Sequence, residues 1–149
     1  MSGLGIAPWA IGLLALGETF TFTIGNPVAS QDFRVKAAAF VFRTGGCAEP
    51  AKPQIGGTAE GLVNGGRRSV PLKVAPTSKP GVYAVYQNWP AEGSWVVNLK
   101  GTCASATAGA IVPIGPNGFI RESSRFLNRP ATDAEIDASL RALEEGANR

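Results

Sequence analysis

Residues 80–103, PGVYAVYQNWPAEGSWVVNLKGTC, constrain the fold more than any other segment of the chain. Alternate positions there hold an aromatic residue, two aliphatic residues, a glycine and a cysteine: Trp95, Val97, Leu99, Gly101 and Cys103. Because successive side chains of a strand point to opposite faces, this pattern predicts a half-buried strand at the centre of a sheet. A second strand is expected over Val82–Tyr86, and Pro90 and Gly93 mark a turn. We therefore expect a hairpin around which the rest of the chain packs.

The composition is that of one domain with many short strands. The 149 residues are 44% hydrophobic and 17% charged, which is enough apolar surface for a real core. Nineteen glycines and eleven prolines are explained best by frequent turns. We predict an antiparallel β-sandwich of seven or eight strands over residues 18–121, followed by a tail over residues 122–149.

Several site chemistries are excluded because the chain has no histidine and only two cysteines. Ser-His-Asp and Cys-His catalysis, histidine-ligated metals and four-thiolate sites all need residues that are missing. We predict neither a metal nor another cofactor. The net charge of +3 is mild, and only Arg67 and Arg68 stand together, so nucleic-acid binding is not expected.

Residues 1–17, MSGLGIAPWAIGLLALG, are predicted to be a signal peptide. Their apolar run is too short to span a bilayer, and Ala15 to Gly17 match a cleavage site. The segment lacks Lys and Arg, and a second cleavage site follows Ser30, so a buried N-terminal element of the domain is the alternative. We expect a secreted or periplasmic protein without a stable membrane span.

Further strands are expected on both sides of this region. Alternation of Phe20, Phe22 and Ile24 with threonines predicts one strand. Residues 32–43 are predicted to form another, with a bulge near Ala38, although the alanine run there could instead nucleate a short helix. Residues 104–110 are predicted to be a loop, residues 111–114 a short strand and residues 115–118 a turn.

A hairpin is predicted over residues 58–74, because Asn64 and Gly65 supply the positive φ angles of a tight turn. Pro71 makes the return strand an edge strand, since proline cannot donate to a ladder. Arg67 and Arg68 are expected to protect that edge with charge.

The tail carries a helix signature. Thr132 and Glu135 form a capping box, and Ile136, Leu140 and Leu143 follow at helical spacing, with Gly146 as the expected stop. The narrow apolar stripe packs on the helix's own domain or docks to a partner; the sequence leaves both open.

Cys47 and Cys103, 56 positions apart, are predicted to form one disulfide in an exported protein. Two unrelated buried thiols are the alternative.

The motif Pro80, Gly81, Tyr83, Pro90, Gly93 and Trp95 resembles a hairpin of exported immunoglobulin-like sandwich domains of the YtkA/FixH kind. The resemblance covers about 20 residues and implies an all-β, immunoglobulin-like antiparallel β-sandwich outside the cytoplasm. Related domains handle copper through histidine and methionine ligands, which this chain does not offer after residue 1, so no activity is implied.

The candidate binding surface is Tyr86, Gln87, Asn88 and Trp89, where aromatic rings stand beside amides; alternatively, Trp89 covers the end of the core. We predict a non-enzymatic exported domain that binds or scaffolds a protein or carbohydrate partner. One rival is a structural subunit of an extracellular assembly or filament, and a homo-oligomer is left open. The other is a small hydrolase using carboxylates such as Glu49, Glu60 and Glu92.

Overall fold

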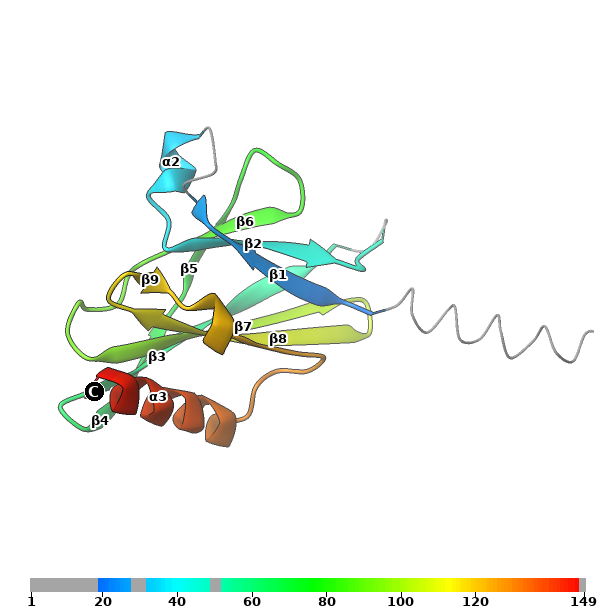
Figure 1. Ribbon diagram of the computed structural model, residues 1–149. Coiled ribbons are helices and arrows are strands. Elements are labelled where there is room, and N and C mark those ends of the chain that lie inside the picture. The colour runs from blue at the N-terminus through cyan, green and yellow to red at the C-terminus, as the bar shows by residue number, and fades with distance from the viewer. Residues whose placement is uncertain (1–18, 28–31, 49–51, 148–149) are drawn as a thin grey trace, which may run out of the picture.

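The computed structural model describes residues 19–27, 32–48 and 52–147 and shows two antiparallel sheets packed together, with a C-terminal helix on one of them (Figure 1). This confirms the predicted sandwich. Ten strands are present in the described part, more than the seven or eight expected, because several are short. In chain order the elements are β1 (Thr21–Gly25), α2 (Phe33–Lys36), β2 (Phe40–Gly45), β3 (Gln54–Val63), β4 (Gly66–Pro71), β5 (Lys73–Pro76), β6 (Val82–Tyr86), β7 (Ser94–Cys103), β8 (Ala106–Gly115), β9 (Gly118–Phe119), η2 (Arg121–Ser123), β10 (Arg125–Leu127) and α3 (Asp133–Ala147).

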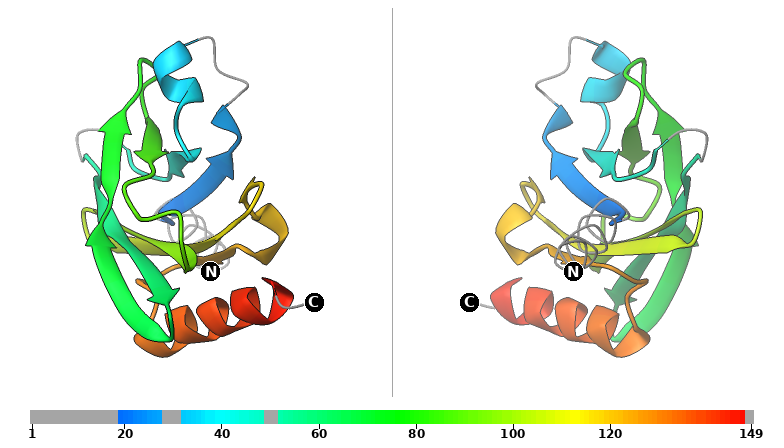
Figure 2. Two further views of the ribbon diagram at one scale, coloured as in Figure 1. Left: turned by 90° about the vertical axis from the view of Figure 1, so that its left-hand side faces the viewer. Right: turned by 90° about the vertical axis from the view of Figure 1, so that its right-hand side faces the viewer.

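Sheet A has the strand order β1-β2-β6-β5, and sheet B has the order β10-β8-β7-β3-β4, with β9 also paired to β8. Figure 2 shows α3 against the outer face of sheet B, on the side away from sheet A. The predicted signal segment and second cleavage site lie outside the described residues. Within the described ranges, no helix has the length and apolarity required to cross a membrane.

Strand β7 is the central strand of sheet B, as predicted, and Trp95, Val97 and Leu99 point into the core with at most 3% of each exposed. The predicted hairpin is wrong, because β6 belongs to sheet A and β7 to sheet B. Residues 87–93 cross between the sheets, and Trp89 within them is buried in the core. This connection exceeds the roughly two to five residues of most hairpin loops, which leaves room for the crossing.

The strand predicted over residues 32–43 is wrong in its first half, which contains the helical turn α2. The Asp32 carboxylate caps this turn by accepting a hydrogen bond from the Arg34 amide at 2.9 Å. The helix precedes the alanine run instead of lying on it. Strand β2 begins only at Phe40, whose side chain lies in the core, whereas the Phe33 side chain is 78% exposed.

The β3–β4 hairpin is confirmed, with φ angles of 52° at Asn64 and 81° at Gly65, and β4 is the edge strand of sheet B. The predicted return strand divides at Leu72, after which the chain enters sheet A as β5. The loop predicted over residues 104–110 is wrong, because β8 begins at Ala106. Its small residues pack closely: a side chain at Gly109 would collide with the Arg129 carbonyl.

The main core lies between the sheets and is rich in phenylalanine; Phe22, for example, makes edge contacts with both Phe20 and Phe42. The predicted disulfide is confirmed: Cys47, just after β2, joins Cys103, the last residue of β7, with Cα atoms 5.7 Å apart. The bond therefore links sheet A to sheet B. In the chain-entropy model such a long loop contributes about 4 kcal/mol of stability.

A second, smaller core fixes α3 to sheet B. Ile136 and Leu140 of the helix pack against Val96 and Ile111, and all four are at most 5% exposed. The capping box is confirmed: the Glu135 amide donates to Thr132 Oγ1 at 3.1 Å, and the Thr132 amide donates to the Glu135 carboxylate at 2.8 Å. The helix thus packs on its own domain. Gly146 does not stop it, because α3 continues to Ala147.

Candidate binding cleft

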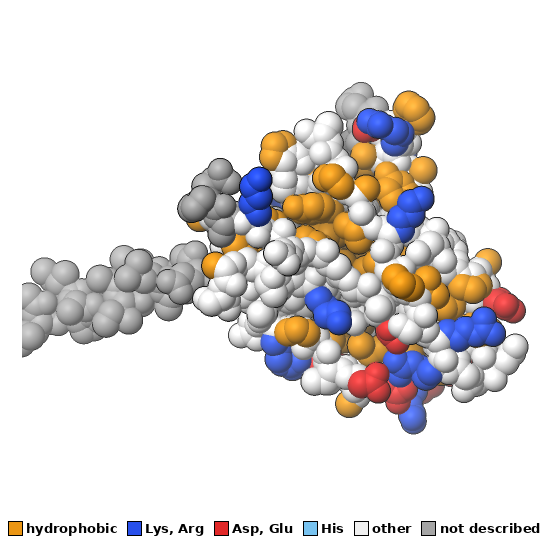
Figure 3. Space-filling view, turned by 180° about the vertical axis from the view of Figure 1, so that it is seen from behind, with side chains coloured by type: hydrophobic (Ala, Val, Ile, Leu, Met, Phe, Trp, Pro, Cys, Tyr) orange, Lys and Arg blue, Asp and Glu red, His pale blue; other side chains and the backbone are white. Residues whose placement is uncertain are grey.

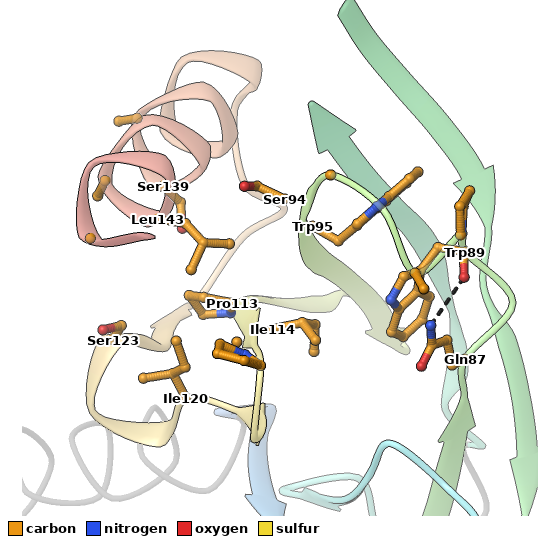
Figure 4. Close-up of a pocket in the computed structure, with 18 of the residues that line it drawn as sticks. Gln87, Trp89, Ser94, Trp95, Pro113, Ile114, Ile120, Ser123, Ser139 and Leu143 are labelled. Carbon is orange, nitrogen blue, oxygen red and sulfur yellow. Dashed lines mark hydrogen bonds between the residues drawn. The ribbon is translucent and has the colours of Figure 1, made fainter. Parts of the chain in front are cut away.

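An open cleft of about 1110 Å³ lies at one end of sheet B (Figure 4). Its walls come from segments that are far apart in the sequence: residues 87–95, the β8–β9 turn with η2, and the second half of α3. The close-up shows Leu143 of α3 facing Pro113 and Ile114 of β8, with the two tryptophans on the side toward the crossover.

The tryptophans of the cleft are fixed and almost wholly buried, with 5% of Trp89 and 3% of Trp95 exposed. Trp95 Nε1 donates to the Glu92 carbonyl at 2.8 Å. Its ring lies directly over Gly61, where a Cβ atom would come within 2.6 Å of it. The cleft therefore has a rigid aromatic base, but neither ring offers an open face.

Helix α3 presents small side chains to the cleft. Ala138, Ala142 and Gly146 recur every four residues along this wall, with Ser139 and Leu143 beside them. This stripe is offset from the apolar stripe that packs on the sheet. Its spacing is readable in the sequence, but small residues at helical spacing do not by themselves indicate the wall of a cleft.

The opposite wall is apolar and is built by Pro113, Ile114, Pro116 and Ile120. Ile120 also packs against Gly115, where an added Cβ would lie 3.0 Å from its side chain, so this turn is compact. Hydroxyl and amide groups stand among the apolar residues: Ser94, Ser123, Ser139 and Gln87. Among the described residues that line the cleft, the charged one is Arg125, whose guanidinium lies 3.4 Å from the Glu135 carboxylate.

The four residues of the predicted binding surface do not form one surface. Gln87 and Trp89 line the cleft, and the Gln87 amide donates to the Trp89 carbonyl at 3.1 Å. Asn88 donates to the Pro71 carbonyl at 2.8 Å and so ties the crossover to β4. Tyr86 lies on sheet A, where its hydroxyl donates to the Arg34 carbonyl at 3.0 Å. The burial of Trp89 agrees with the alternative that it covers the core.

Two of the three carboxylates considered for hydrolysis lie in the described part of the chain, in different surroundings. Glu49 lies outside the described residues, and Glu92 is an exposed residue of the crossover. Glu60, only 9% exposed, accepts hydrogen bonds from Arg67 at 2.9 Å and from Ser69 at 2.6 Å. Burial alone would raise the pKa of Glu60, but hydrogen bonds from Ser69, Thr58 and Arg67 outweigh it and lower the pKa below its ordinary value. A general acid at neutral pH needs the opposite shift.

Arg67 connects this carboxylate to α3. Its guanidinium lies 2.9 Å from Glu60, 3.3 Å from Asp133 and 3.4 Å from Asp137. The hydrogen bond to Glu60 is the main reason that the pKa of Arg67 is raised. The sequence analysis expected Arg67 to guard an edge; in the structure it fastens the helix that forms one wall of the cleft.

A second ion pair fixes the beginning of α3. Arg129 binds Glu135 through two nitrogens, at 2.8 Å and 2.9 Å. Together with the Thr132 amide, these hydrogen bonds lower the pKa of Glu135 to about 2. The helix is thus held at its first turn by Glu135 and along its side by Arg67.

The described residues contain no cluster of three or more Cys, Asp or Glu side chains that could hold a metal ion. Ser124, whose neighbour Ser123 lines the cleft, donates to the Ile120 carbonyl at 2.9 Å and closes the η2 turn. No family model, no curated protein and no solved structure matches this chain, so the resemblance to YtkA/FixH-type domains stays a prediction.

Proposed function

We propose that this protein is a non-enzymatic, extracytoplasmic binding domain whose cleft holds an apolar segment of a protein partner. The observation that carries the proposal is the lining of the cleft. Isoleucine, leucine and proline side chains line its two walls, and serine hydroxyls stand among them. Such a lining suits a peptide, because apolar pockets take its side chains while hydroxyls bond its backbone.

A protein ligand fits this cleft better than a carbohydrate. Sugar recognition commonly uses an aromatic face that is open to stacking, but Trp89 and Trp95 are 5% and 3% exposed. The volume of about 1110 Å³ lies just above the roughly 300–1,000 Å³ range of small-molecule pockets and accommodates several side chains. The small residues of α3 let a peptide backbone approach the helix closely.

The extracytoplasmic location is supported by the disulfide between the sheets, since such bonds persist in oxidising compartments. The predicted signal segment points the same way. In that compartment the cleft would meet secreted or envelope proteins.

Two matched variants of α3 test the proposal. Ala142 and Ala134 are both exposed alanines of this helix, but only Ala142 lines the cleft. Arginine is a good helix former, so Ala142→Arg fills the cleft while Ala134→Arg leaves it open, and both preserve the helix. Peptides selected from a random display library on the wild-type protein should carry apolar residues. They should bind Ala142→Arg at least about tenfold more weakly, a loss of 1.4 kcal/mol, and Ala134→Arg unchanged.

Selected peptides that bind both variants equally would overturn the proposal. The proposal would also be overturned if the library yielded no binders and oligosaccharides from a panel bound the wild-type protein but not Ala142→Arg. The cleft would then be a sugar site.

The rival functions have no observation that favours them. A filament could form by donation of the first strand or of the C-terminal helix to a neighbouring copy, but β1 is already paired with β2 and α3 already packs on sheet B. Light scattering on the purified protein tests the assembly hypothesis. Single substitutions of Glu49, Glu60 and Glu92 in an activity screen test the hydrolase hypothesis.

A further inference from the structure

The end of the molecule opposite α3 carries a one-sided positive charge. Five cations lie on α2, sheet A and the β5–β6 turn: Arg34, Lys36, Arg43, Lys73 and Lys79. Among the described residues of these elements, the sole carboxylate is the α2 cap Asp32, which pairs with Arg34 at 3.4 Å. By contrast, α3 holds five carboxylates and one arginine. Figure 3 shows most of the acidic side chains gathered toward the α3 end, whereas Lys and Arg side chains stand at both ends.

The cations stand around a strip of small apolar residues on the outer face of sheet A, in which Ala84 is 1% exposed while Val41 and Ala75 are partly exposed. The register places Val41 opposite Ala84, and Ala84 opposite Ala75. Arg43 lies two residues after Val41 on β2, at one end of this strip. Lys73 lies two residues before Ala75 on β5, at the other end. An apolar strip with cations at both ends fits a broad anionic surface better than a single small anion.

The α2 turn adds an exposed ring to one end of this face. Phe33 is 78% exposed and stands beside Arg34, whose side chain is 76% exposed. The turn is held in place because the Tyr86 hydroxyl donates to the Arg34 carbonyl, and Lys73 Nζ lies 5.7 Å from the Tyr86 ring centre. In Figure 1, α2 projects beyond the strands of sheet A.

We propose that this face docks on an anionic lipid membrane, with Phe33 inserted among the headgroups and Arg34, Lys36 and Lys73 on lipid phosphates. An aromatic ring beside cations is the composition of interfacial membrane anchors. A projecting ring needs a surface that it can penetrate, which a bilayer provides and a flat acidic protein surface does not. The docking face belongs to sheet A and α2, whereas the cleft is built mainly by sheet B and α3, so docking leaves the cleft free for its ligand.

The test is co-sedimentation of the full chain with vesicles of phosphatidylcholine alone and of phosphatidylcholine with 30% phosphatidylglycerol. Each cation near such a surface contributes about fivefold in affinity, so Lys36→Gln with Lys73→Gln should weaken binding about 25-fold. Phe33→Ser should weaken it about tenfold. The matched control is Lys52→Gln with Lys100→Gln, which removes the same charge from exposed lysines outside sheet A and α2 and should bind as wild type does.

Three results would overturn the proposal. The first is equal binding to both kinds of vesicle. The second is an equal loss in the control double variant, which would show attraction to net charge alone. The third is binding to soluble polyglutamate that is unchanged in Phe33→Ser and is not competed by vesicles. That result would identify a site for an acidic macromolecule. None of these outcomes depends on whether the cleft binds peptides.

Discussion

The outer faces of the two sheets differ in how far their side chains are buried, although inward and outward residues alternate along the strands of both sheets. On sheet B, the outward residues Val96 and Ile111 are completely buried because α3 covers them. On sheet A, the outward residue Val41 stays partly exposed, and Arg43 beside it is exposed. Large outward residues are therefore buried where α3 covers the sheet, whereas on sheet A the outward residue that is buried, Ala84 at 1% exposed, is a small one. The covered face yields a cleft along its helix, and the uncovered face yields a charged surface.

The strongest way to break this comparison is to remove the contact that seats α3. Leu140 is fully buried, so Leu140→Ala should lower the free energy of unfolding by about 3 kcal/mol, measured by urea denaturation. Val41→Ala, on the face without a helix, should cost about 1 kcal/mol or less. Equal costs at the two positions would show that α3 adds nothing to the burial of sheet B.

Removing Arg67 should have the next largest effect. Arg67→Ala leaves Glu60, 9% exposed, without its cation and also loses the two aspartates of α3. Because Arg67 is itself partly exposed, we expect a loss of about 2 kcal/mol in urea denaturation, less than for a fully buried pair. The exposed neighbour Arg68 is the control, and Arg68→Ala should change stability by less than about 0.5 kcal/mol.

Replacing the buried polar residue Asn98 should stabilise the protein. Asn98 is 6% exposed, and its Oδ1 atom has no hydrogen-bond partner within the described structure, while Nδ2 reaches Thr58 at only 3.4 Å. Asn98→Leu removes a buried amide and adds apolar contact under the helix, so stability should rise by about 1 kcal/mol. A loss in urea denaturation would mean that this amide has a partner important for seating α3.

The smallest expected effect is the acid sensitivity of the helix start. The pKa of Glu135 is about 2 in the folded protein and near its ordinary value of 4.5 when unfolded. The folded state is therefore favoured above about pH 4.5, and this contribution is lost as the pH falls toward 2. Glu135→Gln should lower the melting temperature at pH 7 and narrow its difference from wild type at pH 3. If the difference in melting temperature were the same at pH 7 and at pH 3, the ion pair of Glu135 would not contribute to stability.

The sequence predicts the local features of this fold well. The central strand β7, the tight turn at Asn64 and Gly65, the capping box at Thr132 and the disulfide all depend on short patterns or on the cysteine count. It does not predict which sheet a strand joins: β6 and β7 look like a hairpin, and only packing of Trp89 between the sheets separates them.

The cleft could be predicted only in part, because its walls come from three distant segments. Residue type alone predicts Gln87 and Trp89 as binding residues, and both line the cleft. Ile120 and Ala142 meet there only because α3 packs on sheet B, and no local pattern states that docking position. The spacing of the small residues of α3 is visible in the sequence, but the wall of the cleft that faces them is not.

The most direct test of the account is chemical-shift mapping by nuclear magnetic resonance with a peptide selected on the wild-type protein. The account predicts that the backbone amides of Ser94, Ile120 and Ser139, which line the cleft, shift on binding, while those of Arg43 and Lys73 on sheet A do not. Shifts concentrated on sheet A, with the amides of the cleft unchanged, would contradict it.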